Sequence, residues 1–588
     1  AYMGIDWYTV QNRRQKISWV FFVEEAYYWC YATYIVGTIL VGALLIWALE
    51  PNGQLTFWQS VYSSAACVSQ SGLAVVDWSK QARSTYVISF CLIILGSAPL
   101  LHMVPVLLRK TSFRYQARMA SLKDVHHAPA HVAPIDPNLW SPSAPVMFRR
   151  TYSDPCGLTG VEEETDTKVE QGLFTVQRVV SEKAEAQWKC AQTLEANHRL
   201  EYKALAAVLK IMVGYWLVVQ LIGFLIFFVY FHYGTGKIQD KFFAEGNRSH
   251  WHALYLTVSS FQNNGLVLTS SSVMDFATSP ILLMTIGALI VLGNTGLPIM
   301  VRLLAVLMER RAEPGSEHKQ AMDFLLEHPR RCFTHIFPAV HTLWLLLVVL
   351  SLNFLGTLVF VSQDFSDSPA FNGLSTHEMV ISAIFQAISA RTAGLNSINL
   401  AKLSQGSTFF LMIMMYLSTS PTVVTMRLSM GTQSSELDIT GRAEGIEEGV
   451  LTGEATLKGQ ARRYLTQDVT YLLVITFLIC CFEKDNFNRA ALLVSPDSDG
   501  IYTDFGFFKV IFEIISAYGT CGLSLGYEDQ VTSFSSVWSP ASQLLLVLTM
   551  VLGRLRGLPD SIDPSVRIAM PGVAKHDDDE HDHAFLAY

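Results

Sequence analysis

The sequence contains little charge for its length. Only 16% of its 588 residues are Asp, Glu, Lys or Arg, whereas soluble proteins average about 25%. Hydrophobic residues make up 51% of the chain. A soluble protein needs a charged surface, so this composition excludes an ordinary soluble domain and predicts a chain that lies largely within a membrane.

Patterns for nucleic-acid and metal binding are also missing. The net charge of -8 is small and no basic stripe with interleaved aromatic residues is present, so we expect no nucleic-acid partner. The nine cysteines follow neither zinc spacing nor the pattern of a secreted disulfide framework. The sequence therefore predicts no transition-metal site and no cofactor.

Long apolar runs are what the sequence has instead. A helix of about 20 apolar residues crosses the hydrocarbon layer of a bilayer. Eight such runs predict eight transmembrane helices, at residues 27–49, 85–108, 204–233, 279–304, 334–361, 406–427, 463–482 and 540–555.

Four shorter semi-apolar stretches lie between paired runs, at 54–68, 250–262, 374–388 and 505–517. They are too short to cross the bilayer, so they predict re-entrant helices that enter the membrane and turn back. Each is followed by a Gly-Leu dipeptide, at Gly72, Gly265, Gly394 and Gly522. This recurrence predicts an internal repeat of helix, short helix and helix.

The predicted fold is an all-α polytopic membrane protein in which four such units surround a pseudo-fourfold central pore. The units, numbered first to fourth in chain order, are expected at residues 27–108, 204–304, 334–428 and 463–555. The other segments are 1–26, 109–203, 305–333, 429–462 and 556–588, and a helix is expected near 178–203.

The distribution of Lys and Arg predicts the orientation. These residues are concentrated in the segments outside the units, which places those segments and both termini in the cytosol. The short helices then enter from the outer side. The N-x-S/T sequon at Asn247 lies in an outer segment, agrees with this orientation and predicts a glycosylation site.

The glycines predict an ion path. Irregular backbone at membrane depth is tolerated only where protein buries it or where it lines a water-filled path. Inward-pointing backbone carbonyls can replace the hydration shell of a cation, and glycine permits the φ angles that this requires. The predicted ion-binding residues are Ser71, Gly72, Asn264, Gly265, Thr392, Ala393, Gly394, Thr520, Cys521 and Gly522.

Several phrases resemble a known family. SQSGLAVVDWS, FQNNGLVLTSSSVMDF, SARTAGLNSINLA, AYGTCGLSLGYED and GRLRGLPDSID are similar to segments of the Trk/Ktr/HKT superfamily of potassium transporters, above all its fungal Trk branch. The resemblance covers roughly residues 27–560. It implies potassium uptake driven by the membrane potential, and a glycine in every loop implies potassium rather than sodium, with Gly72 the most informative position.

Charged residues near the loops suggest supporting roles. We expect Asp77, Asp275, Glu528 and Asp529 at the pore mouth, where carboxylates concentrate cations, although an ordinary polar outer loop is the alternative. The positive charge of Arg391 would repel an ion on the pore axis. We therefore expect its side chain behind the selectivity filter, which the predicted ion-binding residues form, and bonded to a carbonyl or to Glu513 or Glu378. A direct ion-sensing role for Arg391 is the alternative.

Two features predict a gate. Ser418, Thr419, Ser420 and Pro421 interrupt the sixth apolar run, and proline removes a helix hydrogen bond. The resemblance implies an intramembrane gating loop there, with a simple kink as the alternative. Arg554 resembles the basic residue that the family has near the pore, where it would limit ion residence or hold the gate, while snorkelling to the interface is the alternative.

The sequence as a whole predicts a channel-like potassium transporter of the plasma membrane, and not an enzyme. A sodium or mixed sodium/potassium transporter of the same build is the alternative. A polytopic membrane enzyme is remote, because the predicted spans hold almost no Asp, Glu or His. The expected partners are potassium ions, the lipid bilayer and, as the resemblance implies, further copies of the chain in a homodimer or larger assembly.

Overall fold

The structure, a computed structural model, describes residues 27–50, 55–111, 169–233, 249–333, 335–366, 368–417, 453–492, 505–527 and 532–556. Within these ranges every regular element is an α-helix or a 3-10 helix, as an all-α protein requires. Seven residues with predicted roles lie outside the described residues, namely Asn247, Ser418, Thr419, Ser420, Pro421, Glu528 and Asp529.

The described helices are distributed over the four predicted units in sets that are not identical. The first unit contains α2 (Tyr27–Leu49), α3 (Phe57–Ser69), α4 (Arg83–Leu95) and a helix at Ala98–Thr111. The second contains α6 (Val169–Tyr233), α8 (Ser249–Gln262), α9 (Pro280–Gly293) and α10 (Leu297–Arg311), followed by α11 (Glu317–Glu327) and α12 (Pro329–Cys332). The third contains α13 (Ala339–Asp364), α14 (Thr376–Thr392) and α15 (Gln405–Leu417). The fourth contains α17 (Gly453–Phe482), α18 (Lys484–Leu492), α19 (Phe507–Tyr518) and α20 (Pro540–Leu555).

The described helices include fewer clear membrane spans than the sequence predicts. Tyr28–Leu49, Arg199–Tyr233 and Ala339–Asp364 are each long and apolar enough to cross a membrane. Two bent pairs, Arg83–Leu95 with Ala98–Thr111 and Pro280–Gly293 with Leu297–Arg311, bring the number to five if each pair is one span. The remaining apolar helices, Gln405–Leu417, Asp468–Phe482 and Pro540–Leu555, are shorter.

The helices in the spans predicted at 85–108 and 279–304 are broken. The chain bends there by 48° and 79°. A Cβ on Gly96 would lie 2.2 Å from the carbonyl oxygen of Val68, and one on Gly293 would lie 1.7 Å from that of Phe261. Each bend therefore lies where the helix backbone touches the end of the unit's short helix.

A tyrosine hydroxyl supports each bend. A break in a helix leaves carbonyl groups without their usual donors, and at membrane depth protein must supply the replacement. The Tyr34 hydroxyl donates to the Leu95 carbonyl at 3.0 Å, and the Tyr215 hydroxyl donates to the Leu292 carbonyl at 2.7 Å. Both acceptors immediately precede the glycine at the break, so the first two units solve the same problem in the same way.

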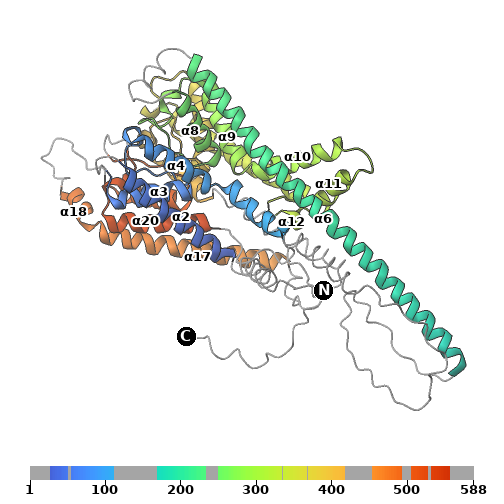
Figure 1. The fold of residues 1–588 in the computed structure, drawn as a ribbon. Coiled ribbons are helices and arrows are strands. Elements are labelled where there is room, and N and C mark those ends of the chain that lie inside the picture. The colour runs from blue at the N-terminus through green and yellow to red at the C-terminus, as the bar shows by residue number, and fades with distance from the viewer. Residues whose placement is uncertain are drawn as a thin grey trace, which may run out of the picture.

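Helix α6 continues well beyond its apolar part. It has 65 residues without a proline, which at ~1.5 Å per residue makes it about 100 Å long. The helix expected near 178–203 and the span expected at 204–233 are thus one element. Its N-terminal part projects away from the other helices (Figure 1).

Buried carboxylates at the end of the first helix of three units bind the start of the first α-helix after the glycine loop. Glu50 accepts a hydrogen bond from the Ala82 amide at 3.3 Å, Asp364 from the Ser404 amide at 2.8 Å, and Glu483 from the Ser539 amide at 2.8 Å. Each amide lies at the N-terminus of that helix, where a negative charge is favourable. In the second unit the Tyr230 hydroxyl donates to Ser279 at the same place, at 2.8 Å.

The three large apolar cores each extend over more than one unit. One cluster combines Tyr62 and Leu92 of the first unit with Ile514 and Leu546 of the fourth. Helices α3 and α20, which come from opposite ends of the chain, consequently pack side by side (Figure 1). The first and fourth units are thus spatial neighbours, and the chain of units closes on itself.

Candidate cation-selective site

The four short helices all end just before their glycine. In each loop the glycine has a positive φ, 65° at Gly72, 87° at Gly265, 65° at Gly394 and 88° at Gly522. L-residues adopt this region at a cost of about 1–2 kcal/mol, whereas glycine adopts it freely. The amide groups fold back onto the short helices, as in the hydrogen bond from Ser71 to the Ala66 carbonyl at 3.1 Å.

The four glycine loops contact one another in a closed cycle. The space that a Cβ would take on each glycine is already filled by a backbone carbonyl oxygen of the next loop, at a distance that real Cβ atoms essentially never show. The contacts are Gly72 with the Asn264 oxygen at 1.9 Å, Gly265 with Ala393 at 2.1 Å, Gly394 with Cys521 at 2.1 Å, and Gly522 with Ser71 at 2.3 Å. The glycine loops, of which Gly72 and Gly522 are 450 positions apart, are therefore brought together in the order first, second, third, fourth, first.

The third loop is built differently from the others. Gln70, Asn263 and Thr520 stand two residues before the glycine and have φ values of 64°, 60° and 51°. In the third unit the equivalent residue is Thr392, which is still part of α14. Arg391 and Thr392 therefore belong to the last turn of a helix, which continues beyond the short stretch predicted at 374–388.

Arg391 is buried beside the third loop, with a relative exposure of 3%. Its backbone carbonyl accepts a hydrogen bond from the Cys521 thiol at 3.0 Å, which links the third and fourth loops. Glu378 cannot be its partner, because the two residues stand 13 positions apart on α14, a separation of about 20 Å along a helix. Glu378 instead accepts hydrogen bonds from Ser375 and closes a capping box at the start of α14.

Glu513 faces a different neighbour from the one expected. Its carboxylate is fully buried on α19 and accepts a hydrogen bond from the Ser535 amide at 3.1 Å. Ser535 belongs to a 3-10 turn at Phe534–Val537 that follows the fourth loop. Glu513 therefore supports the outer segment of the fourth unit.

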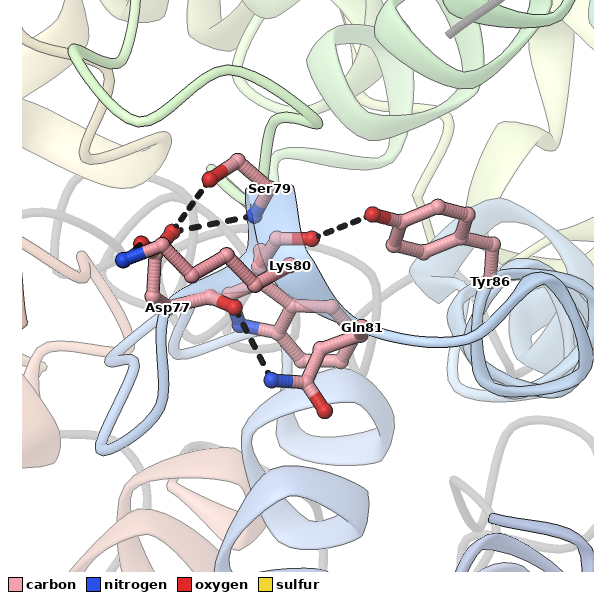
Figure 2. A network of polar contacts seen from close by, with 6 residues as sticks. Asp77, Ser79, Lys80, Gln81 and Tyr86 are labelled. Atoms are coloured by element: carbon pink, nitrogen blue, oxygen red, sulfur yellow. Dashed lines mark hydrogen bonds and ion pairs between the residues drawn. The ribbon is translucent and has the colours of Figure 1, made fainter. Parts of the chain in front are cut away.

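The acidic residues predicted at the pore mouth are held by local bonds. Figure 2 shows that Asp77 accepts hydrogen bonds from the Ser79 amide and hydroxyl at 3.1 and 2.6 Å, and its carboxylate lies 3.1 Å from Lys80. Partial burial favours the neutral carboxyl, but these bonds outweigh it and hold the pKa of Asp77 below its usual value. Asp275 is hydrogen-bonded to Ser271. Both carboxylates thus shape the segments that follow their loops.

Arg554 connects the fourth unit to the first. Its guanidinium donates a hydrogen bond to the carbonyl of Gly96, at the bend between α4 and the next helix. The bend frees this carbonyl from a regular helix, and a charged donor is a strong replacement. Residues 418–421, where the resemblance implies a gate, lie outside the described residues.

The sequence reading missed Arg556. Its guanidinium donates to the Tyr416 carbonyl at 2.8 Å, lies 3.1 Å from the Asp468 carboxylate and stacks over the rings of Tyr416 and Tyr518 at 4.8 and 5.1 Å. This cluster ties α15, α17, α19 and α20 together below the loops. The second arginine of GRLRG and a lone Asp near the start of an apolar run were the signals that could have indicated it.

A bundle of apolar helices around converging glycine loops is the build of a membrane transport protein for cations. The family described as "TrkH: Cation transport protein" matches residues 185–572, and the chain belongs to this family.

Relatives in this family are named as transporters, not as enzymes. The chain is 32% identical over 387 residues to potassium transporter TRK1 of Candida albicans, 30% identical over 399 residues to the low-affinity potassium transport protein of Saccharomyces cerevisiae, and 32% identical over 369 residues to potassium transport protein 1 of Schizosaccharomyces pombe. These matches cover 66%, 63% and 62% of the chain but only 35%, 43% and 42% of the relatives.

A solved structure, that of the potassium transporter TrkH from Vibrio parahaemolyticus, matches with a TM-score of 0.45 and 11% sequence identity. The match covers 90% of this chain and 82% of that one. A likeness of this degree supports no argument about the site.

Proposed function

We propose that the chain is a plasma-membrane potassium uptake transporter in which eight crossings and four re-entrant helices surround one central path. The closed cycle of glycine contacts is the observation that carries this proposal. In this proposal the carbonyls at equivalent positions, in Ser71, Asn264, Ala393 and Cys521, form one level around a common centre, and the contact of each with the glycine of a neighbouring loop supports it. Such a level can replace the water around a monovalent cation.

The electrostatics favour a cation over an anion. Backbone carbonyl oxygens carry partial negative charge, so a ring of them attracts cations. The membrane potential then drives inward movement, at about 2.3 kcal/mol per charge and 100 mV. Arg391 is a brace behind the path, because its backbone holds Cys521 of the next loop.

Potassium is the proposed substrate because all four loops carry glycine and because the named relatives are potassium transporters. The gate at the inner end of the path is assigned to Ser418–Pro421, and Arg554, whose guanidinium donates to the Gly96 carbonyl, is assigned to the same end. Both termini are cytosolic, Asn247 is an outer glycosylation site, and the chain assembles with further copies of itself in this proposal.

Flux measurements on the purified full chain in lipid vesicles test the proposal. With an imposed negative-inside potential, we expect uptake of potassium and rubidium in clear excess over sodium. Equal uptake of sodium and potassium would replace the proposal with a mixed carrier, and no uptake of any alkali ion would overturn it.

A further inference from the structure

Three of the four junctions between neighbouring loops are bridged by a side chain of the loop itself. Asn264 donates to the Ala66 and Cys67 carbonyls at 3.0 and 3.2 Å, which joins the second loop to the first unit. Thr392 donates to the side-chain oxygen of Asn263 at 2.8 Å, and Cys521 donates to the Arg391 carbonyl at 3.0 Å. Each of these residues stands one or two positions before its glycine and reaches back to the preceding unit.

The fourth junction lacks this bridge. Ser71 holds the equivalent position in the first loop and is fully buried, but its hydroxyl has no hydrogen-bond partner among the described residues. The first and fourth loops also come from opposite ends of the chain, so no short backbone segment joins them. Something else has to fix this junction if the cycle is to keep its width.

A series of hydrogen bonds behind the first loop holds the junction between the fourth and first loops. Ser533 and Ala74, two residues after Gly72, are joined by two bonds: the Ser533 amide donates to the Ala74 carbonyl at 2.7 Å, and the Ala74 amide donates to the Ser533 hydroxyl at 2.8 Å. Next to this pair, the hydroxyls of Tyr62 on α3 and Ser535 are bonded at 2.8 Å. The first loop is thus attached to the outer segment of the fourth unit.

Glu513 is the fixed end of this series of hydrogen bonds. Its Oε1 accepts from the Ser535 amide at 3.1 Å and so holds Ser535 in place for Tyr62. Glu513, Ser535 and Tyr62 have exposures of 0%, 0% and 1%. Hydrogen bonds in such a low-dielectric interior are strong, and a lost partner is costly.

We infer that Glu513, acting through Ser535 and Tyr62, is a specificity-determining positioning residue that closes the cycle between the fourth and first loops. The inference rests on the proposed function. Discrimination between cations depends on the size and stiffness of the carbonyl cage. Because the other three junctions have their own bridges, loosening this series of hydrogen bonds widens one junction and lets the cage adapt to sodium.

The role depends on an acceptor at residue 513, not on its charge. Oε1 of Glu513 is the atom that accepts the bond from the Ser535 amide. Glu513→Gln keeps an oxygen for the Ser535 amide, whereas Glu513→Met keeps the side-chain size and removes the acceptor. Tyr62→Phe removes only the hydroxyl. Tyr86→Phe is the matched control, because that hydroxyl is equally buried but bonds Trp78 of its own unit at 2.7 Å.

The experiment is the ratio of potassium to sodium uptake by the full chain in lipid vesicles, normalised to folded protein. We expect Glu513→Met to lower the ratio about tenfold and Tyr62→Phe about threefold, sizes typical of lost buried hydrogen bonds. Glu513→Gln and Tyr86→Phe should stay within about twofold of the parent. The double variant Glu513→Met with Tyr62→Phe should be no worse than Glu513→Met alone, since both act through Ser535.

An unchanged ratio in folded Glu513→Met, or an equal loss in Glu513→Gln, overturns the inference. If Glu513→Met does not fold, Tyr62→Phe decides: an unchanged ratio, or the same change in Tyr86→Phe, overturns it as well. A parent chain that carries no potassium overturns the proposed function instead, so the two failures are distinguishable.

Discussion

The third glycine loop reaches the same contacts as the other three from a different backbone. In the first, second and fourth loops a left-handed residue precedes the glycine by two positions, while in the third the helix α14 continues through Thr392. Even so, the missing Cβ of Gly394 faces the Cys521 oxygen at 2.1 Å, the same distance as for Gly265 and Ala393. The contact between loops is preserved although the path that leads to it differs.

This difference separates two kinds of constraint. The residue two positions before the glycine only has to end a helix, and either an αL turn or one more helical residue achieves that. The glycine has to leave room for the neighbouring carbonyl, which no other residue can do. The comparison between the third loop and the others can therefore be tested at both positions.

The largest effect is expected at the glycines. Gly265→Ala should abolish potassium uptake in vesicles, because its Cβ would lie 2.1 Å from the Ala393 oxygen. Gly394→Ala should abolish it equally, since the third loop has the same contact. Backbone strain alone would give a far smaller loss, of about 1–2 kcal/mol in stability.

Gly373→Ala separates crowding from strain. Gly373 has the same φ as Gly265, 87°, but nothing lies within 4 Å of its missing Cβ. We expect this variant to transport normally. A similar loss of uptake in the variants at 373 and 265 would contradict the view that contact between loops is the constraint.

Gly72→Ser should lower potassium uptake as strongly as Gly265→Ala, because its contact is at least as close, and any residual uptake should be less selective. The added side chain displaces the Asn264 carbonyl, which lies 1.9 Å from the position of its Cβ, and one oxygen of the cage moves. We expect the potassium-to-sodium ratio of this residual uptake to fall about tenfold, equivalent to roughly 1.4 kcal/mol. Growth of transport-deficient cells on limiting potassium, with and without sodium, provides an independent measurement, and unchanged ion preference would remove Gly72 from the site.

Arg391→Ala should lower transport several-fold without abolishing it. The Arg391 side chain is buried beside the third loop, and Cys521 of the fourth loop binds the Arg391 carbonyl. Removing the side chain leaves a cavity and loosens the third loop. The measurement is vesicle flux at equal protein amounts. Arg199→Ala, which removes a side chain that is 73% exposed and pairs with Glu317, is the control and should transport normally. Intact transport and selectivity in Arg391→Ala would exclude a bracing role.

A smaller effect distinguishes the third loop from the fourth. Thr392→Gly should destabilise the protein by about 1 kcal/mol, because glycine is a poor helix former. Thr520→Gly should be neutral or slightly stabilising, because Thr520 has φ 51° and glycine adopts this region freely. Thermal unfolding of the two purified variants in the same detergent measures the difference, and equal shifts would show that the two loops end their helices alike.

The smallest effect is expected for Asp77→Asn. The carboxylate is partly neutralised by Lys80, and surface charges are screened over about 8 Å at physiological salt. We expect uptake at low ionic strength to fall by no more than about twofold. Because the pKa of Asp77 is lowered, its carboxylate is charged at and above the pH range in which Asp usually titrates, and it is neutralised only when the external pH falls below that range. Uptake should therefore not change near neutral external pH on account of this residue.

Periodicity and composition predict much of this fold. The order of helices and the position of each glycine loop follow from apolar runs and a recurring dipeptide, which are local properties. Hydrophobicity alone does not predict the bends at Gly96 and Gly293, but Pro99 and Pro298 beside them are helix-breaking residues in the sequence. The carbonyls that contact the two glycines come from another helix, and only the packed structure supplies them.

The sequence likewise predicts the positions of the site's loops but not the contacts of its side chains. The glycines mark the loops, but the partners of charged residues depend on side-chain directions that the sequence does not contain. By sequence alone, Glu378 and Glu513 are equivalent candidates for the partner of Arg391. In the structure Glu378 caps its own helix and Glu513 binds the Ser535 amide. Arg556 was missed because its partners, Asp468 and Tyr416, come from two other helices.

The most direct test is a density map of the full chain in lipid, recorded once in potassium and once in sodium. We predict a peak on the axis between the carbonyls of Ser71, Asn264, Ala393 and Cys521 in potassium, and a weaker or displaced peak in sodium. Loops that lie apart, or a side chain that fills this centre in both salts, would contradict the account.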